Sequence, residues 1–309
     1  MQKSQKKISL IYFGTPQIAV KSLEHFINSE EFDVLAVVTQ PDRPKGRGHH
    51  LTPSPVKEVA LKYNIPVFQP CSIRKEVDIQ EELKNLNPDF FVTFAFGQIL
   101  SQEVLDIPKY ETINLHASLL PRYRGANPIQ RAIINGDNET GICTMITELG
   151  LDCGDICMKY PIKLTDEMNC EDLACEIAES SPELLDKTLK GLYEGSLSPI
   201  KQSEDGVCIA KKITKEECKI DWDCDAKSIH NLVRGVYNSP CAFFEYQGKI
   251  IKVLETQVIE KSANAGEFLC ATKNGLEVGC GNNCLLIKKL KPEGKGIMSA
   301  SDWYRGLKK

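Results

Sequence analysis

Two polar residues two positions apart, Asn114 and His116, stand out for the chemistry that they could do. Side chains alternate between the faces of a strand, so in a strand both would share one face, opposite Ile113 and Leu115. An asparagine amide can donate hydrogen bonds to an oxygen that gains negative charge, and a histidine can move a proton near neutral pH. The pair predicts a site that stabilises an oxyanion and transfers a proton.

A carboxylate that could complete this site is Asp152, in the segment Gly150–Asp155. Glycines there permit positive φ angles and a close approach of the backbone to a ligand. Each residue also has an ordinary structural interpretation: an asparagine on a strand surface, a hydrogen-bonded core histidine and an aspartate in a turn. Spacing alone favours the ordinary interpretations, and both alternatives stay open at this point.

The first half of the chain alternates apolar runs with segments of helical spacing. The expected strands are Ile8–Phe13, Phe32–Thr39, Ile65–Phe68, Asp89–Phe94 and Glu111–Leu115. The expected helices are Ala19–Phe26, Ser54–Tyr63 and Ile79–Asn85. This alternation predicts an α/β fold, with a Rossmann-like, mostly parallel sheet covered on both faces. Such sheets bind ligands at the carboxyl ends of their strands, which is where Asn114 and His116 would lie.

The turn Gly14–Pro16 after the first expected strand is where a dinucleotide fingerprint would begin. That fingerprint needs two further glycines at fixed spacing, and Gln17–Phe26 contains none. A nicotinamide cofactor is therefore not expected, which argues against a nucleotide-linked oxidoreductase. A plain turn and a turn that holds part of a substrate are both compatible with the sequence.

The second half changes character at an exposed linker near Ser196–Ala210. Short alternating runs follow a helix expected at Ala226–Val236, and they lie at Cys241–Tyr246, Lys249–Ile259, Phe268–Thr272, Leu276–Val278 and Cys284–Leu290. This pattern predicts a small antiparallel, OB-like β-barrel or a sandwich. We expect a catalytic domain over residues 1–197, a linker over 198–210 and a C-terminal domain over 211–309.

Composition excludes several classes of protein. Apolar residues make up 42% and charged residues 26% of the 309 positions, which is unlike a disordered or collagen-like chain. Apolar runs such as Phe90–Phe96 are too short to cross a bilayer, and the basic start Met1–Lys7 leads into a strand with no signal-peptide cleavage site. The thirteen cysteines include no Cys-x-x-Cys pair, so we expect reduced thiols and no structural metal.

The net charge of −4 is unevenly distributed. Residues 1–200 hold 20 Lys and Arg against 28 Asp and Glu, whereas residues 201–309 hold 18 against 14. The second half is thus basic, although the whole chain is acidic, so the total charge does not exclude a nucleic-acid partner.

The segment His116–Ile129, HASLLPRYRGANPI, resembles the signature of the 10-formyltetrahydrofolate-dependent formyltransferases. The resemblance implies that Asn114, His116 and Asp152 form the catalytic trio. It also implies a folate pocket, in which the pterin meets mainly backbone groups, formed by Phe94, Ala95, Phe96, Gly97, Gln98, Ile99, Leu100, Ser118, Leu119, Leu120 and Pro121.

Further segments resemble the branch of this family that acts on methionyl-tRNA. They are Thr39–Gly48, Thr52–Lys57, Lys212–Trp222 and Lys291–Ala300, and the likeness runs from about Ile8 to Gly306. The resemblance implies formyl transfer from 10-formyltetrahydrofolate, a cosubstrate and not a resident cofactor, to the α-amine of initiator methionyl-tRNA for translation initiation. It implies a cytoplasmic enzyme, of a bacterium or of organelle-type translation. The absence of sustained heptads favours a monomer.

Basic residues indicate where RNA would bind. The family resemblance implies that the loop with Arg43, Lys45 and Arg47 enters the acceptor stem of the tRNA. Without the resemblance, such a segment is typical of a solvated basic loop. Basic residues of the C-terminal domain could follow the RNA backbone or only aid solubility: Lys211, Lys212, Lys288, Lys289, Lys291, Lys295, Arg305, Lys308 and Lys309.

The sequence departs from the family pattern at a few positions. Phe96 stands where Tyr is common, Asn127 where a small apolar residue is common, Cys153 where Thr is common, and Asn238–Pro240 replaces Asn-Pro-x-Pro. The main alternative is a formyl-folate enzyme that acts on a sugar-nucleotide amine or glycinamide ribonucleotide, or hydrolyses the donor. It would not need the basic segment. A non-catalytic RNA-binding protein is a second alternative.

Overall fold

The computed structural model describes residues 6–45 and 50–307, which divide into two compact units. The first unit comprises residues 1–125, 141–162 and 174–209. The second comprises residues 126–140, 163–173 and 210–309. The C-terminal part of the chain thus folds together with two earlier segments.

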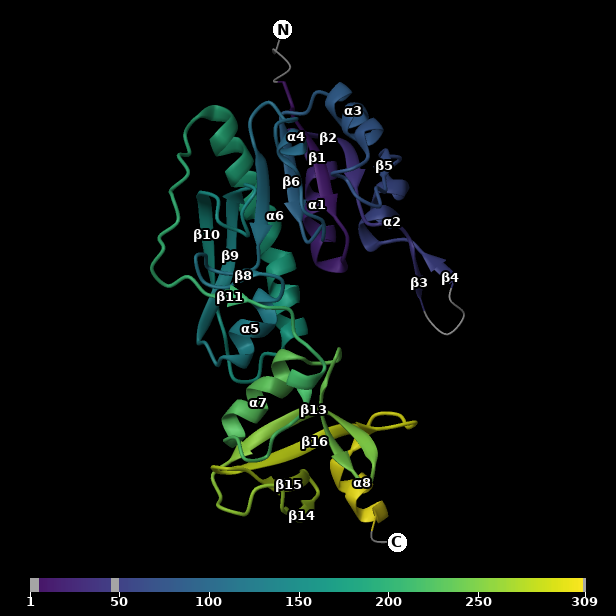
Figure 1. Cartoon of the computed structure of the whole chain (residues 1–309), viewed down its shortest axis with the longest axis vertical. Helices are drawn as coiled ribbons and strands as arrows, with labels where there is room; N and C mark the ends of the chain where they lie inside the picture. Colours follow the sequence, from purple (N-terminus) through teal and green to yellow (C-terminus); the bar gives the residue numbers. More distant parts are fainter. Residues whose placement is uncertain (1–5, 46–49, 308–309) are drawn as a thin grey trace. The chain divides into compact units, whose positions relative to one another are not determined.

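A seven-stranded sheet forms the centre of the first unit, in the order β10-β9-β7-β6-β1-β2-β5 (Figure 1). Its strands are β1 (Ile8–Gly14), β2 (Phe32–Val38), β5 (Val67–Phe68), β6 (Phe90–Phe94), β7 (Thr112–His116), β9 (Glu139–Ile146) and β10 (Ile156–Lys163). The five strands from β5 to β7 are parallel, and β9 is antiparallel to β7. The predicted mostly parallel sheet is confirmed.

Helices cover both faces of this sheet. The side chains of each strand point alternately to the two faces, so both faces carry apolar side chains that need covering. They are α1 (Val20–Asn28), α2 (Pro55–Lys62), α3 (Val77–Asn85), α4 (Gln102–Leu105) and α6 (Cys170–Glu194). Ile11 and Phe13 of β1 share a core with α3 and α4. Tyr12 points to the opposite face and contacts Phe26 of α1, with ring centroids 6.5 Å apart. Helix α6 is hydrogen-bonded to α1 through several side chains.

The register of the parallel strands determines which residues meet at the carboxyl edge. Gly14 at the end of β1 pairs with Phe94 at the end of β6, and Thr93 pairs with Asn114 of β7. The segment after β6 and the polar end of β7 therefore lie at the same edge of the sheet. This is the edge at which α/β proteins bind their ligands.

The second unit contains an antiparallel sheet in the order β12-β13-β16-β15-β14, with β17 paired to β16. Its elements are β12 (Ala242–Tyr246), β13 (Lys249–Ile259), β14 (Phe268–Thr272), β15 (Gly275–Gly279), β16 (Cys284–Pro292), β17 (Met298–Ser299), α5 (Pro128–Ile134), α7 (Ala226–Gly235) and α8 (Ala300–Leu307). β12 and β14 stand at opposite ends of the strand order, and yet the rings of Phe244 on β12 and Phe268 on β14 lie only 6.0 Å apart. The sheet therefore curls around its core as a barrel does.

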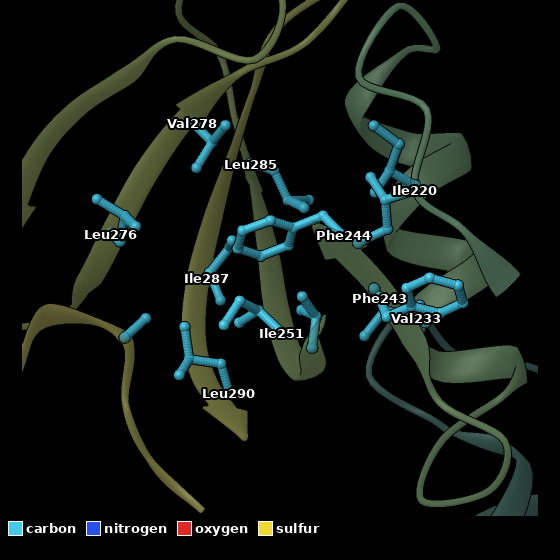
Figure 2. Close-up of a cluster of buried hydrophobic side chains, with 14 of the residues drawn as sticks. Ile220, Val233, Phe243, Phe244, Ile251, Leu276, Val278, Leu285, Ile287 and Leu290 are labelled. Carbon is cyan, nitrogen blue, oxygen red and sulfur yellow. The ribbon is translucent and has the colours of Figure 1, made fainter. Parts of the chain in front are cut away.

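Figure 2 shows this core, to which α7, β12, β13, β15 and β16 all contribute. Neighbouring phenylalanines of β12 point to opposite sides: Phe244 lies among Leu285 and Ile287, and Phe243 lies beside Val233 of α7. The curled sheet thus has a packed interior and an outer face covered by α7.

Short strands complete the chain. β3 (Arg43–Lys45) pairs with β4 (His50–Thr52) in a ribbon that extends beyond α2 (Figure 1), and β8 (Arg124–Gly125) pairs with β11 (Ile209–Ala210). The thirteen cysteines are free thiols. Within residues 6–45 and 50–307, no His, Cys, Asp and Glu side chains gather to hold a metal, and no helix is long and apolar enough to cross a membrane.

Candidate active site

Asn114 and His116 lie on β7 with their side chains on one face of the strand, as the alternation predicts. The buried hydroxyl of Thr93 on β6 donates a hydrogen bond to Asn114 Oδ1 at 2.8 Å. Because a hydroxyl donor requires the carbonyl oxygen on that side, the two N–H groups of Nδ2 face away from Thr93. The contact with Thr93 thereby fixes which end of the amide accepts and which end donates.

His116 is buried, and both of its ring nitrogens face oxygen atoms. Nε2 lies 2.8 Å from the carbonyl oxygen of Tyr123, and because a carbonyl only accepts, Nε2 carries a hydrogen and donates it. Nδ1 lies 3.6 Å from Asp152 Oδ2. That distance is longer than a hydrogen bond and short enough for an ion pair with a protonated ring.

Asp152 adopts a left-handed backbone conformation, with φ of 46°, in the loop between β9 and β10. Its Oδ2 accepts a hydrogen bond from the backbone N–H of Gly125 at 2.8 Å, which aims the carboxylate at His116. The structure therefore brings Asn114, His116 and Asp152 together from β7 and a loop 36 residues later in the chain.

The Asp152 loop needs its glycines for space. A Cβ at Gly154 would lie 2.0 Å from the carbonyl oxygen of Ile146, so only glycine fits there. A Cβ at Gly150 would lie 2.2 Å from Cys153 Sγ. The side chain of Cys153, one of the departures from the family pattern, thus occupies the space beside Gly150 that a Cβ would need.

Three residues outside the predicted site support the trio: Thr93, Arg124 and Gln202. Arg124 and Gln202 are buried, at 8% and 6% exposure, and Gln202 falls in the expected linker. Its side-chain Nε2 donates to the carbonyl oxygens of Asp152 and Gly154, at 2.9 and 2.7 Å. Buried polar residues of this kind give no periodic signal in a sequence, because their partners are distant in the chain.

The residues expected to bind folate after β6 alternate between buried and exposed. Phe94, Phe96 and Leu100 are buried, whereas Ala95, Gly97 and Ile99 are exposed. The ring of Phe96 packs edge-on against Phe13, with centroids 5.3 Å apart, so this side chain belongs to the core. The Phe96 carbonyl oxygen accepts hydrogen bonds from Thr15 and Gln40, each at 3.1 Å, which hold the segment in place.

Two further residues expected in the folate pocket use their side chains to fix the backbone. Gln98 accepts from the N–H of Ile73 and donates to the carbonyl of Pro70, both at 2.8 Å. Ser118 donates to the carbonyl of Arg122 at 2.6 Å. Leu119 is partly exposed, Leu120 is buried, and a cis peptide bond joins Leu120 to Pro121. These side chains shape the segments, which is consistent with recognition of a ligand by backbone groups.

The basic segment forms part of the β3–β4 ribbon. Arg43 is exposed, Lys45 pairs with His50 in the register, and Arg47 lies outside the described residues. At the base of the ribbon, hydrogen bonds from Lys57 and Gln69, together with the charge of Lys57, lower the pKa of the Asp42 carboxyl. The ribbon is therefore anchored to α2 and to the end of β5.

Several basic residues of the second unit form ion pairs. Lys288 and Lys289 both face Glu255, at 3.8 and 2.8 Å, and Arg305 lies 3.7 Å from Asp302. Lys308 and Lys309 lie outside the described residues. The charge available to a partner on this unit is accordingly smaller than the count of basic residues suggests.

Comparison with known proteins identifies the family. The model of a formyl transferase domain matches residues 6–189, and the model of a formyl transferase C-terminal domain matches residues 212–308. The chain belongs to the formyl transferase family. This assignment confirms the resemblance carried by the His116–Ile129 signature.

Among its curated relatives, methionyl-tRNA formyltransferase from Clostridium perfringens is 48% identical over 286 residues, which cover 92% of each chain. The protein of the same name from Clostridium tetani is 44% identical over 303 residues, which cover 97% of each chain. Among solved structures, an N-formyltransferase from Helicobacter canadensis in complex with folinic acid and dTDP-3-aminofucose has a TM-score of 0.67 at 18% identity, over 91% of this chain and 99% of that chain. That likeness concerns the fold alone.

Proposed function

We propose that this formyl transferase moves the formyl group of 10-formyltetrahydrofolate to the α-amine of initiator methionyl-tRNA, producing N-formylmethionyl-tRNA for translation initiation. The relatives that match it over more than nine-tenths of their own length are named methionyl-tRNA formyltransferase. The observation that carries the proposal is the trio, in which an oriented Asn114 amide stands beside a His116–Asp152 pair. An oriented donor and a proton-transferring pair are what transfer of an acyl group to an amine requires.

The reaction begins when the neutral amine attacks the formyl carbon. A new C–N bond forms, and the carbonyl oxygen becomes the oxyanion of a tetrahedral intermediate. Asn114 Nδ2 donates to this oxygen, and a protonated His116 adds positive charge nearby. One such donor is worth ~10²–10³ in rate.

The intermediate collapses when the bond from carbon to the folate nitrogen breaks. The amine must lose a proton and the departing nitrogen must gain one. His116 Nε2–H is engaged by the Tyr123 carbonyl, so proton exchange on the ring is confined to Nδ1, which faces Asp152. We assign the proton transfer to this pair, either directly or through a water molecule that bridges it.

The same proposal distributes binding along the chain. Folate binds at the carboxyl edge of β1, β6 and β7 through the backbone of residues 94–100 and 118–121. Arg43, Lys45 and Arg47 bind the acceptor stem, and the basic C-terminal domain, residues 211–309, follows the RNA backbone beyond the linker at 198–210. The enzyme acts in the cytoplasm as a monomer.

A formylation assay with labelled 10-formyltetrahydrofolate tests the proposed acceptor. The acceptors to compare are charged initiator tRNA, charged elongator tRNA, free methionine and a dTDP-amino sugar. We expect label on the initiator tRNA, with at most weak labelling of the others. Preferential labelling of the amino sugar, or release of formate with no acceptor labelled, would overturn the proposal.

A further inference from the structure

The side-chain amide of Gln202 uses every hydrogen-bonding position that it has. Nε2 donates one hydrogen to the carbonyl of Asp152 and the other to the carbonyl of Gly154, at 2.9 and 2.7 Å. Oε1 accepts from Arg124 Nε and Nη2, at 3.1 and 2.9 Å. A buried amide that is fully paired is held in one orientation, and it holds its partners in return.

The backbone around Gln202 is fixed on both sides. Ile200 exchanges two hydrogen bonds of 2.8 Å with Ile156 at the start of β10. Further along, the Cys208 carbonyl accepts from the N–H of Arg124 at 3.0 Å, and Cys208 Sγ accepts from the N–H of Tyr123 at 3.1 Å. Residues 200–208 therefore form a strap that is attached to β10 at one end and to β8 at the other.

Both members of the His116–Asp152 pair depend on segments that this strap holds. Tyr123 supplies the carbonyl that accepts from His116 Nε2, and Gly125 supplies the N–H that binds Asp152 Oδ2. Arg124, between them, orients Gln202, which in turn binds the backbone of Asp152. Asp152 is thus held at its carboxylate by Gly125 of β8 and at its main chain by Gln202, which Arg124 of β8 orients.

We propose that Gln202 is a positioning residue that keeps Asp152 in its left-handed conformation with its carboxylate facing His116. This rests on the proposed catalytic role of Asp152. A φ of 46° is uncommon for a residue with a side chain, although Asp tolerates it better than most, and the two hydrogen bonds from Gln202 hold the backbone on either side of Cys153 in place. Without the two bonds to the carbonyls of Asp152 and Gly154, the loop relaxes and the carboxylate moves away from Nδ1.

Two variants separate the amide from the bulk of the side chain. Gln202→Met keeps the volume and removes all four hydrogen bonds. Gln202→Glu keeps the acceptors for Arg124 but sets carboxylate oxygen against two carbonyl oxygens. We expect both variants to lower kcat by about 10- to 100-fold, because a displacement of about 1 Å in a catalytic group costs up to ~10²-fold. KM for the folate and for methionyl-tRNA should stay within about twofold, since Gln202 is buried and its amide is fully paired within the protein.

Lys201→Met is the matched control, because Lys201 is the exposed neighbour on the same strap. It should retain wild-type kcat. Calorimetric binding of 5-formyltetrahydrofolate, a non-reacting analogue, should be retained by all three variants and shows that each is folded.

A double-mutant cycle with Asp152→Asn tests whether Gln202 acts through Asp152. If it does, Gln202→Glu lowers kcat by less than about threefold in the Asp152→Asn background. An undiminished loss there, a wild-type kcat for both Gln202 variants, or lost binding of the analogue would overturn the inference. A wild-type kcat for Asp152→Asn alone would instead refute the catalytic role of Asp152 in the proposed function, so the two failures are distinguishable.

Discussion

At the scale of single residues, the proposed role of Asn114 as a hydrogen-bond donor depends on Thr93. Asparagine can be rotated by 180° at little cost in an unrestrained site, and one of its two orientations would present an acceptor to an oxyanion. The Thr93 hydroxyl selects the other orientation, because it donates to Oδ1. In the proposed mechanism, the oxyanion site is therefore preorganised before substrate arrives.

Thr93→Val should lower kcat by about tenfold, which corresponds to the loss of one orienting hydrogen bond. KM for the folate should change little, because Thr93 is buried behind Asn114. Steady-state kinetics of formyl transfer measure both constants. Thr93→Ser keeps the hydroxyl and should retain most of the activity; an equal loss in both variants would show that packing, and not the hydroxyl, is responsible.

The trio itself could be predicted from the sequence, whereas its support could not. Asn114 and His116 are two positions apart, so strand geometry alone places them together. Asp152 was a candidate because of its glycine-flanked loop, and the family resemblance implied that it belongs to the trio. Gln202 and Arg124 meet only after folding, and in the sequence Gln202 resembles any polar residue of a linker.

At the scale of elements, the β3–β4 ribbon, proposed to bind RNA, is separate from the segments proposed to bind folate. It projects beyond α2, whereas the folate segments follow β6 and β7 (Figure 1). Contacts between arginine and phosphate are ionic, and they release counterions from the RNA.

Arg43→Ala should therefore raise KM for methionyl-tRNA several-fold and leave KM for the folate unchanged. The plot of log kcat/KM for the tRNA against log salt concentration should become shallower by about one unit, as expected for one lost phosphate contact. Arg74→Ala, at another exposed arginine of the same unit, is the control. An equal rise in KM for both substrates would contradict the assignment of the ribbon to tRNA.

In the second unit, α7 carries a buried histidine, His230, that should make this unit sensitive to acid. His230 Nε2 donates to the Asp166 carbonyl at 3.0 Å, and Nδ1 lies 2.9 Å from the Thr256 hydroxyl. Burial, with the nearby charges of Arg234 and Lys227, lowers the pKa of this histidine from 6.5, against an opposing effect of the Asp166 carbonyl and Glu167. As the pH falls below 6.5, the unfolded chain binds this proton before the folded chain does.

The free energy of unfolding should consequently decrease from pH 7 to pH 5.5 more steeply in the wild type than in His230→Gln. One proton accounts for at most about 1.4 kcal/mol per pH unit of that difference. Chemical denaturation followed at several pH values measures it. Parallel pH profiles for the two proteins would show that His230 is not the responsible group.

Most regular elements could be predicted from the sequence to within one or two residues, because β1 and β6 are continuous apolar runs, and helical or alternating patterns are clear in α2 and the barrel strands. Other helices and strands were not predicted from the sequence. Helix α6 contains Pro182, which normally signals the end of a helix, and here the 25-residue helix continues through it. α5 is only seven residues long, and its place in the second unit depends on contacts that no local pattern encodes.

At the scale of the whole molecule, the distribution of charge matters more than its sum. The chain carries −4 in total, but its last 109 residues are basic, and the acidic first part contains a basic ribbon. Negative charge elsewhere limits non-specific attraction to nucleic acid, while the basic regions offer a binding surface. Some lysines are already paired with carboxylates, such as Lys289 with Glu255, so the effective basic surface is restricted.

In the proposed reaction, Asn114, His116 and Asp152 transfer a formyl group to methionyl-tRNA. Single-turnover transfer of label from 10-formyltetrahydrofolate to charged initiator tRNA, by the wild type and by Asp152→Asn, tests it most directly. We predict that the wild type labels the tRNA and that Asp152→Asn does so ~10²–10³ times more slowly, while it still binds 5-formyltetrahydrofolate. No labelling by the folded wild type, or equal rates for the two proteins, would contradict the claim.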